Sequence, residues 1–175
     1  MMTSIVLTVI GEDKPGLVSA LSQKITAGGG NWLDSRMASL GGKFAGLLLI
    51  SVPQARAEAL VATLQDLEQQ GLRLVVERGT DVAATATMGR LLRLELTGQD
   101  RPGIVRDISD TLARQKVNIE DMETAFFSGS FSGEDMFEMR ATLRAPAALT
   151  DTALREAIEK LANNLMVDIS LDAAA

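Results

Sequence analysis

The chain has 175 residues, of which 46% are hydrophobic, and its formal net charge is −6 with no run of Lys or Arg. Without a basic run, it lacks the electrostatic signature of proteins that bind nucleic acid directly. It also contains no Cys and no His, which excludes disulfides, Cys-His and Ser-His catalysis, and the commonest zinc ligands. We therefore expect no metal site and no cofactor.

The N-terminal residues lack the basic stretch and cleavage site of a signal peptide. No apolar run approaches the roughly 18 residues of a membrane-spanning helix. These two features predict a cytoplasmic protein with no membrane partner.

One motif occurs twice. Residues 11–18 read GEDKPGLV and residues 98–105 read GQDRPGIV, so the second copy matches the first, class by class, 87 positions later. Each copy lies between a strand-like and a helix-like apolar run, which indicates an internal duplication. We predict domains at residues 1–79 and 89–175, joined by a linker at 80–88. Domains of about 85 residues are marginal alone, so a homodimer is expected.

The first half alternates between strand and helix patterns. Strands are predicted at residues 3–10, 31–40, 44–52 and 72–77, and helices at 15–27 and between Pro53 and Gly71. Gly41 and Gly42 separate the middle strands, which is typical of a hairpin. Residues 46–50 are almost continuously apolar, as in strands covered on both faces, so we expect this strand at a domain or subunit contact.

The second half repeats this order. Strands are predicted at residues 90–97, 117–126, 136–143 and 165–171, and helices at 102–115 and 150–163. Pro146 corresponds to Pro53 with about six extra residues, which fall in a Gly/Ser-rich stretch at 127–135. This stretch is either a plain hairpin loop or a mobile lid or contact surface. The predicted fold class is α+β, with two ferredoxin-like βαββαβ domains in tandem and antiparallel sheets.

The repeated motif carries residue types suited to starting a helix. Asp13 and Asp100, each followed by a proline, predict N-terminal caps. Gly16 and Gly103 fall in the first helical turn, where glycine costs stability. We interpret these glycines as positions where a ligand or a neighbouring chain approaches the backbone closely.

The same turn can recognise an amino acid. A helix N-terminus offers N–H groups and a positive dipole to a carboxylate, and Asp13 or Asp100 offers negative charge to an ammonium group. Asn31 and Asn118 each follow their motif glycine by 15 residues. They either complete a polar clamp or simply end the helix–strand connection.

Arg101 and Lys14 occupy the same place in the two copies of the motif. Each is either a solvated surface charge or an electrostatic partner for a ligand carboxylate. The residues alone leave both interpretations open.

The motif Gly-x-Asp-Lys/Arg-Pro-Gly-Leu/Ile-Val, followed by Asn-Trp-Leu-Asp or Asn-Ile-Glu-Asp, resembles that of the ACT domain, a small regulatory module that binds amino acids. The tandem is similar to the ACT protein family typified by the glycine cleavage system transcriptional repressor. The resemblance implies sheets joined side by side, with ligands held between paired units at the repeated turn. The ligand-binding residues that it implies are Asp13, Gly16 and Asn31 in the first half and Asp100, Gly103 and Asn118 in the second. Arg101 is added as a ligand-binding candidate for its charge.

The function that this resemblance implies is amino-acid sensing without catalysis. Such a regulator acts through a DNA-binding protein partner rather than on DNA, and the resemblance alone suggests glycine or serine as the ligand. A ligand-free ACT scaffold for dimerisation or protein interaction is the alternative. An enzyme using carboxylates with Arg101 or Lys14 is a third hypothesis, but no paired acid and base beside a nucleophile stands out.

Overall fold

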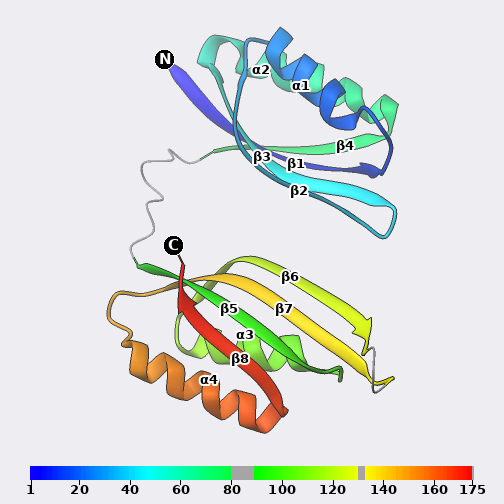
Figure 1. Ribbon diagram of the computed structural model, residues 1–175. Helices are drawn as coiled ribbons and strands as arrows, with labels where there is room; N and C mark the ends of the chain where they lie inside the picture. The colour runs from blue at the N-terminus through cyan, green and yellow to red at the C-terminus, as the bar shows by residue number, and fades with distance from the viewer. Residues whose placement is uncertain (80–88, 130–132, 175) are drawn as a thin grey trace. The chain divides into compact units, whose positions relative to one another are not determined.

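The computed structural model describes residues 1–79, 89–129 and 133–174 (Figure 1). The chain divides into two compact units, Met1–Ala86 and Thr87–Ala175. The linker predicted at 80–88 and part of the stretch at 127–135 lie outside the described residues.

The first unit is a four-stranded antiparallel sheet with its helices on one face (Figure 1). Its elements are β1 (Met2–Glu12), α1 (Leu17–Ala27), β2 (Asn31–Leu40), β3 (Lys43–Pro53), the 3-10 helix η1 (Gln54–Arg56), α2 (Ala57–Gln65), the 3-10 helix η2 (Asp66–Gln70) and β4 (Leu72–Arg78). The strand order β2-β3-β1-β4 leaves β2 and β4 at the edges of the sheet.

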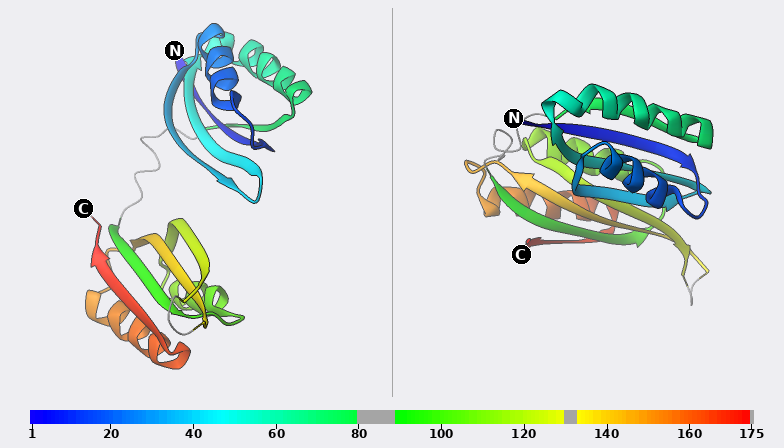
Figure 2. Two further views of the ribbon diagram at one scale, coloured as in Figure 1. Left: turned by 45° about the vertical axis from the view of Figure 1, so that its right-hand side comes forward. Right: turned by 90° about the horizontal axis from the view of Figure 1, so that it is seen from above.

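The second unit repeats this architecture, with its helices on one side of the sheet (Figure 2). Its elements are β5 (Arg90–Gln99), α3 (Ile104–Arg114), β6 (Asn118–Ser128), β7 (Asp135–Ala145), α4 (Asp151–Leu165) and β8 (Val167–Ala173). The order β6-β7-β5-β8 matches the first unit strand for strand, which confirms the predicted tandem βαββαβ fold. Within the described ranges, none of these helices is long and apolar enough to cross a membrane.

Each unit has its own hydrophobic core between sheet and helices. Side chains on a strand alternate between the two faces, so every second residue of the central strands is buried. Leu7 and Ile50 from the sheet meet Leu64 of α2 in the first core, and all three are fully buried. Leu94 and Ile108 are fully buried in the second core.

The apolar run in β3 is covered on one face only within its unit. Leu48 and Ile50 point to the helices, whereas Leu47 is 53% exposed on the opposite, outer face of the sheet. On that outer face, Thr8 of β1 pairs in register with Leu47 and with Val75 of β4, which is 58% exposed. The first sheet therefore has an apolar outer face, which remains consistent with the expected contact.

One face of α3 is buried, which predicts how substitutions on the two faces of this helix change the free energy of unfolding. Ile108→Ala should lower the free energy of unfolding of the second unit by about 2–5 kcal/mol, because it removes a fully buried side chain and leaves a cavity. Val105→Ala, on the exposed side of the same helix, should change it by less than about 0.5 kcal/mol. Amide hydrogen exchange in α3 measures both values, and equal effects of the two substitutions would contradict the assigned core.

Candidate functional site

The glycine of each repeated turn adopts a left-handed backbone conformation. Gly16 has a φ of 93° and Gly103 a φ of 99°, and each stands immediately before the first residue of its helix. A non-glycine residue in this region is strained, so the conformation alone accounts for glycine here. A Cβ added to Gly16 would meet no atom within 4 Å. No described residue of the unit therefore requires glycine here by close approach. The approach of a ligand or a neighbouring chain stays a prediction.

The predicted aspartate caps are wrong. Gly16 and Gly103 hold the N-cap positions, and neither α1 nor α3 has a side-chain cap among the described residues. By contrast, the hydroxyl of Thr150 caps α4 by accepting a bond from the backbone N–H of Ala153 at 3.2 Å. The first-turn N–H groups of α1 and α3 are thus left available, because the turn ends on a residue with no side chain.

Asp13 is instead joined to the β2–β3 hairpin. Its backbone N–H donates to the carbonyl of Gly42 at 3.0 Å, and its carboxylate accepts a hydrogen bond from the hydroxyl of Ser39. In the second unit, the backbone N–H of Asp100 donates to the carbonyl of Asp135 at 2.8 Å. Both aspartates therefore link the end of the first strand to the hairpin, and the carboxylate of Asp100 is exposed.

The cation of each motif donates a hydrogen bond to the end of the last helical segment of its unit, which is η2 in the first unit and α4 in the second. Lys14 Nζ donates to the carbonyl of Gln70 at 2.9 Å, and Arg101 Nη2 donates to the carbonyl of Asn164 at 3.1 Å. A cation is favoured there because the last carbonyls of a helix are unpaired and form its negative pole. The partners are 56 and 63 residues away along the chain, so the sequence motif contains no sign of them.

The first glycine of the motif has a packing role. A Cβ on Gly98 would lie 2.4 Å from Cγ1 of Val167, and a Cβ on Gly11 would lie 2.7 Å from the carbonyl oxygen of Gly71. Each glycine therefore lets the first strand approach the last strand of its unit.

Asn31 and Asn118 lie away from the turns of their own units. They are the exposed first residues of β2 and β6. The eleven residues of α1 separate Asn31 from Gly16 by roughly 16 Å along the helix. Asp13 meets Ser39 near the other end of β2, roughly 26 Å from Asn31. A single unit does not bring the proposed clamp together.

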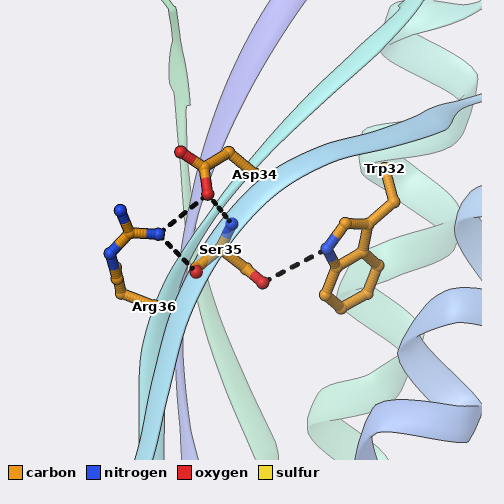
Figure 3. Close-up of polar contacts among 4 residues, drawn as sticks. All are labelled: Trp32, Asp34, Ser35 and Arg36. Atoms are coloured by element: carbon orange, nitrogen blue, oxygen red, sulfur yellow. Dashed lines mark hydrogen bonds and ion pairs between the residues drawn. The ribbon is translucent and has the colours of Figure 1, made fainter.

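A bulge with its own polar network follows Asn31 on β2 (Figure 3). Asp34 Oδ1 accepts from the backbone N–H of Ser35 at 2.8 Å and from Arg36 Nη1 at 2.9 Å. Trp32 Nε1 donates to Ser35 Oγ at 3.3 Å. These hydrogen bonds fix the backbone beside Asn31 and engage the carboxylate of Asp34.

The same bulge occurs in β6, where Glu120 is the extra residue. Both of its carboxylate oxygens accept hydrogen bonds from Arg144 of β7. Hydrogen bonding to Glu120 raises the pKa of the Arg144 guanidinium above its ordinary value. In the part of the chain that the structure describes, no group of three or more Asp or Glu residues is placed to hold a metal ion.

Comparison with known proteins decides the family. The family model of the ACT domain matches residues 3–77 and 90–172, one match in each unit. The chain belongs to the ACT domain family. This membership indicates a regulatory rather than a catalytic protein.

Two relatives of this ACT protein match across both of its units. The glycine cleavage system transcriptional repressor of Escherichia coli (strain K12) is 21% identical over 168 residues, covering 96% of this chain and 88% of the repressor. A crystal structure of an unknown protein from Galdieria sulphuraria is 27% identical with a TM-score of 0.88, covering all of both chains.

A provisionally named glycine cleavage system transcriptional repressor of known structure shares the fold, with 23% identity and a TM-score of 0.74. The match covers 99% of this chain and 98% of the chain of known structure.

The two ACT turns differ in their surroundings. The space beside Gly16 is open, whereas a Cβ on Gly103 would lie 3.0 Å from Nη2 of Arg106. Arg106 forms an ion pair at 2.8 Å with Asp107, in the first turn of α3. The first ACT turn is therefore the more accessible, and the second has an extra cation beside its helix start.

The left-handed turn predicts a graded response to substitution. Gly16→Ala should lower the stability of the first unit by about 1–2 kcal/mol, because a Cβ is disfavoured at this φ. Gly16→Asn should cost less, since asparagine tolerates left-handed backbone better than alanine does. Urea unfolding monitored by hydrogen exchange in α1 measures the order, and alanine proving as stable as glycine would refute the conformational explanation.

Proposed function

We propose that this ACT protein is a non-catalytic, cytoplasmic amino-acid sensor that works as a homodimer and signals through a protein partner. The proposed partner is a DNA-binding regulator. Support for this class comes from the relative that spans 96% of the chain and is named a transcriptional repressor. The chain itself has no basic run with which to bind DNA directly.

The observation that carries the sensing proposal is the uncapped helix start beside a carboxylate. The first-turn N–H groups of α1 and α3 have no side-chain acceptor in the described residues, so they suit a ligand carboxylate. Asp13 and Asp100 lie three residues before the respective N-cap glycines and suit the ligand ammonium group. Glycine and serine are the first candidates, because the relative is named for glycine cleavage.

Pairing of two copies would complete the clamp. β2 is an edge strand, so its outer backbone groups are free to pair with the same strand of a second copy. An antiparallel, two-fold pairing of β2 strands brings Asn31 of one copy toward Ser39 of the other, next to Asp13. The site is therefore proposed to lie between copies, with Asn31 contributed in trans.

The apolar outer face of the first sheet is the surface that we assign to the protein partner. Edge-to-edge pairing of β2 strands does not itself use this face, which presents Leu47, Val75 and the 38% exposed Ile10 within its unit. The matching face of the second sheet carries Arg93, Glu95 and Arg140, so it does not suit an apolar partner. Docking is accordingly proposed for the first unit.

One set of contacts favours the alternative of a ligand-free scaffold. Gly11, Asp13, Lys14 and Gly16 all have structural roles in the turn, so the motif alone does not require a ligand. Partner binding that is unaffected by any amino acid, in the unmodified chain and in Asp100→Ala/Asn118→Ala alike, would support the scaffold.

The sensing proposal predicts a thermal shift. In a panel of the standard amino acids, a small one should raise the melting temperature, with a stabilisation of about 2.7 kcal/mol at a hundredfold excess over Kd. Asp13→Ala and Asn31→Ala should reduce this shift. Asp110→Ala, which removes an exposed carboxylate of α3 outside the site, should not. Failure of every amino acid to shift the melting temperature would eliminate the sensor and leave the scaffold.

A further inference from the structure

A groove of about 580 Å³ runs between α3 and α4 in the second unit. Its apolar lining residues are Pro102, Ala157, Leu161 and Leu165. Three cations, Arg101, Arg114 and Lys160, line it along its length. Its one carboxylate, Asp107, is already paired with Arg106 at 2.8 Å. The groove is thus locally positive in a chain whose net charge is −6.

The first unit fills the equivalent position with an ion pair. Lys24 Nζ lies 3.4 Å from Asp66 Oδ2, which joins α1 to η2. Because the buried residues Leu21 and Leu67 correspond to Ile108 and Leu161, Lys24 corresponds to Thr111 and Asp66 to Lys160. The equivalent residues, with the first unit given before the second, are Leu21/Ile108, Leu67/Leu161, Lys24/Thr111, Asp66/Lys160 and Ala27/Arg114.

The second unit has lost this pair and gained cations. The hydroxyl of Thr111 donates to the carbonyl of Asp107 at 2.8 Å, within its own helix. No hydrogen bond or ion pair with another described residue engages Lys160 or Arg114. Lys160 stands where the first unit has Asp66, and Arg114 stands where it has Ala27. The exchange leaves a positively charged groove that favours an anion from solution.

Arg101 is a further cation of the groove, and a hydrogen bond fixes its side chain. Its bond to the carbonyl of Asn164 uses one of five guanidinium donors, so the others remain available. The fixed side chain lies at one end of the groove, where α3 begins and α4 ends. Arg101 therefore supplies a pre-oriented cation, with less entropy to lose on binding than a free side chain.

We propose that this groove binds a small polyanion carrying at least two carboxylate or phosphate groups, with Arg114 and Lys160 as its charge partners and Arg101 as the third cation. The site lies within one unit and uses neither Asp100 nor Asn118. Arg101 is shared with the candidate amino-acid ligands, but the two charge partners, Arg114 and Lys160, belong neither to the amino-acid clamp nor to the pairing of copies.

Calorimetry on the full chain tests the site with two probes, inorganic pyrophosphate and citrate. At least one should bind with one site per chain, and which one binds distinguishes phosphate from carboxylate chemistry. Arg114→Gln/Lys160→Gln should weaken binding by at least about tenfold, because it removes two charge-assisted contacts. The matched control Arg73→Gln/Arg155→Gln removes two exposed cations outside the groove and should change affinity by less than about twofold.

A second variant imposes the arrangement of the first unit on the second. Thr111→Lys with Lys160→Asp should recreate the interhelical pair, keep the circular dichroism spectrum, and abolish probe binding. The proposal is overturned if neither probe binds the unmodified chain. It is equally overturned if Arg114→Gln/Lys160→Gln binds as tightly as the unmodified chain, or if the control pair loses as much affinity.

Discussion

The left-handed backbone of Gly16 and Gly103 is the constraint on which each unit depends. It lets the chain leave the first strand and begin a helix at the next residue, which is buried in both units. That start directs Leu17 or Ile104, and the buried residues that follow at helical spacing, onto the sheet. It also leaves the first-turn N–H groups without a side-chain cap, so the feature that builds the core exposes a binding surface.

Duplication has preserved this scaffold and diversified its surfaces. Lys14 and Arg101 make the same bond to the end of a helical segment in their two units. Yet the outer face of the first sheet is apolar where that of the second is charged. The position that is bridged by Lys24 and Asp66 in the first unit holds Thr111 and Lys160 in the second, and no described residue forms an ion pair with Lys160. The proposed division of labour, with a protein contact on one unit and an anion site on the other, follows from these differences.

Much of the fold could be predicted because its signals are local. Hydrophobic periodicity located the eight strands and four α-helices of the described residues, although not the 3-10 helices η1 and η2 on either side of α2. Gly41-Gly42 located a tight turn in which both glycines have positive φ. The aspartate caps were wrong because three residues, Lys14 to Gly16, separate Asp13 from the helix and a backbone conformation replaces the cap. A local pattern cannot distinguish these two ways of starting a helix.

The candidate site was harder to predict because it depends on distances across the fold. Asn31 follows Gly16 closely in sequence, yet a whole helix places it at the opposite end of the unit. The bond from Lys14 to Gln70 joins residues 56 positions apart, and no motif records it. Only the strand order shows that β2 is an edge, which is what makes a contribution of Asn31 from a second copy geometrically reasonable.

The most direct test of the account is complementation between two defective copies. Asp13→Ala and Asn31→Ala should each lose amino-acid binding in the first unit, measured in chains that also carry Asp100→Ala/Asn118→Ala. If Asn31 acts in trans, unfolding and refolding the two together should restore about a quarter of the first-unit sites, since random pairing makes half of the dimers mixed and each mixed dimer has one intact site. Two variants that stay inactive when mixed, or that bind normally alone, would contradict the account.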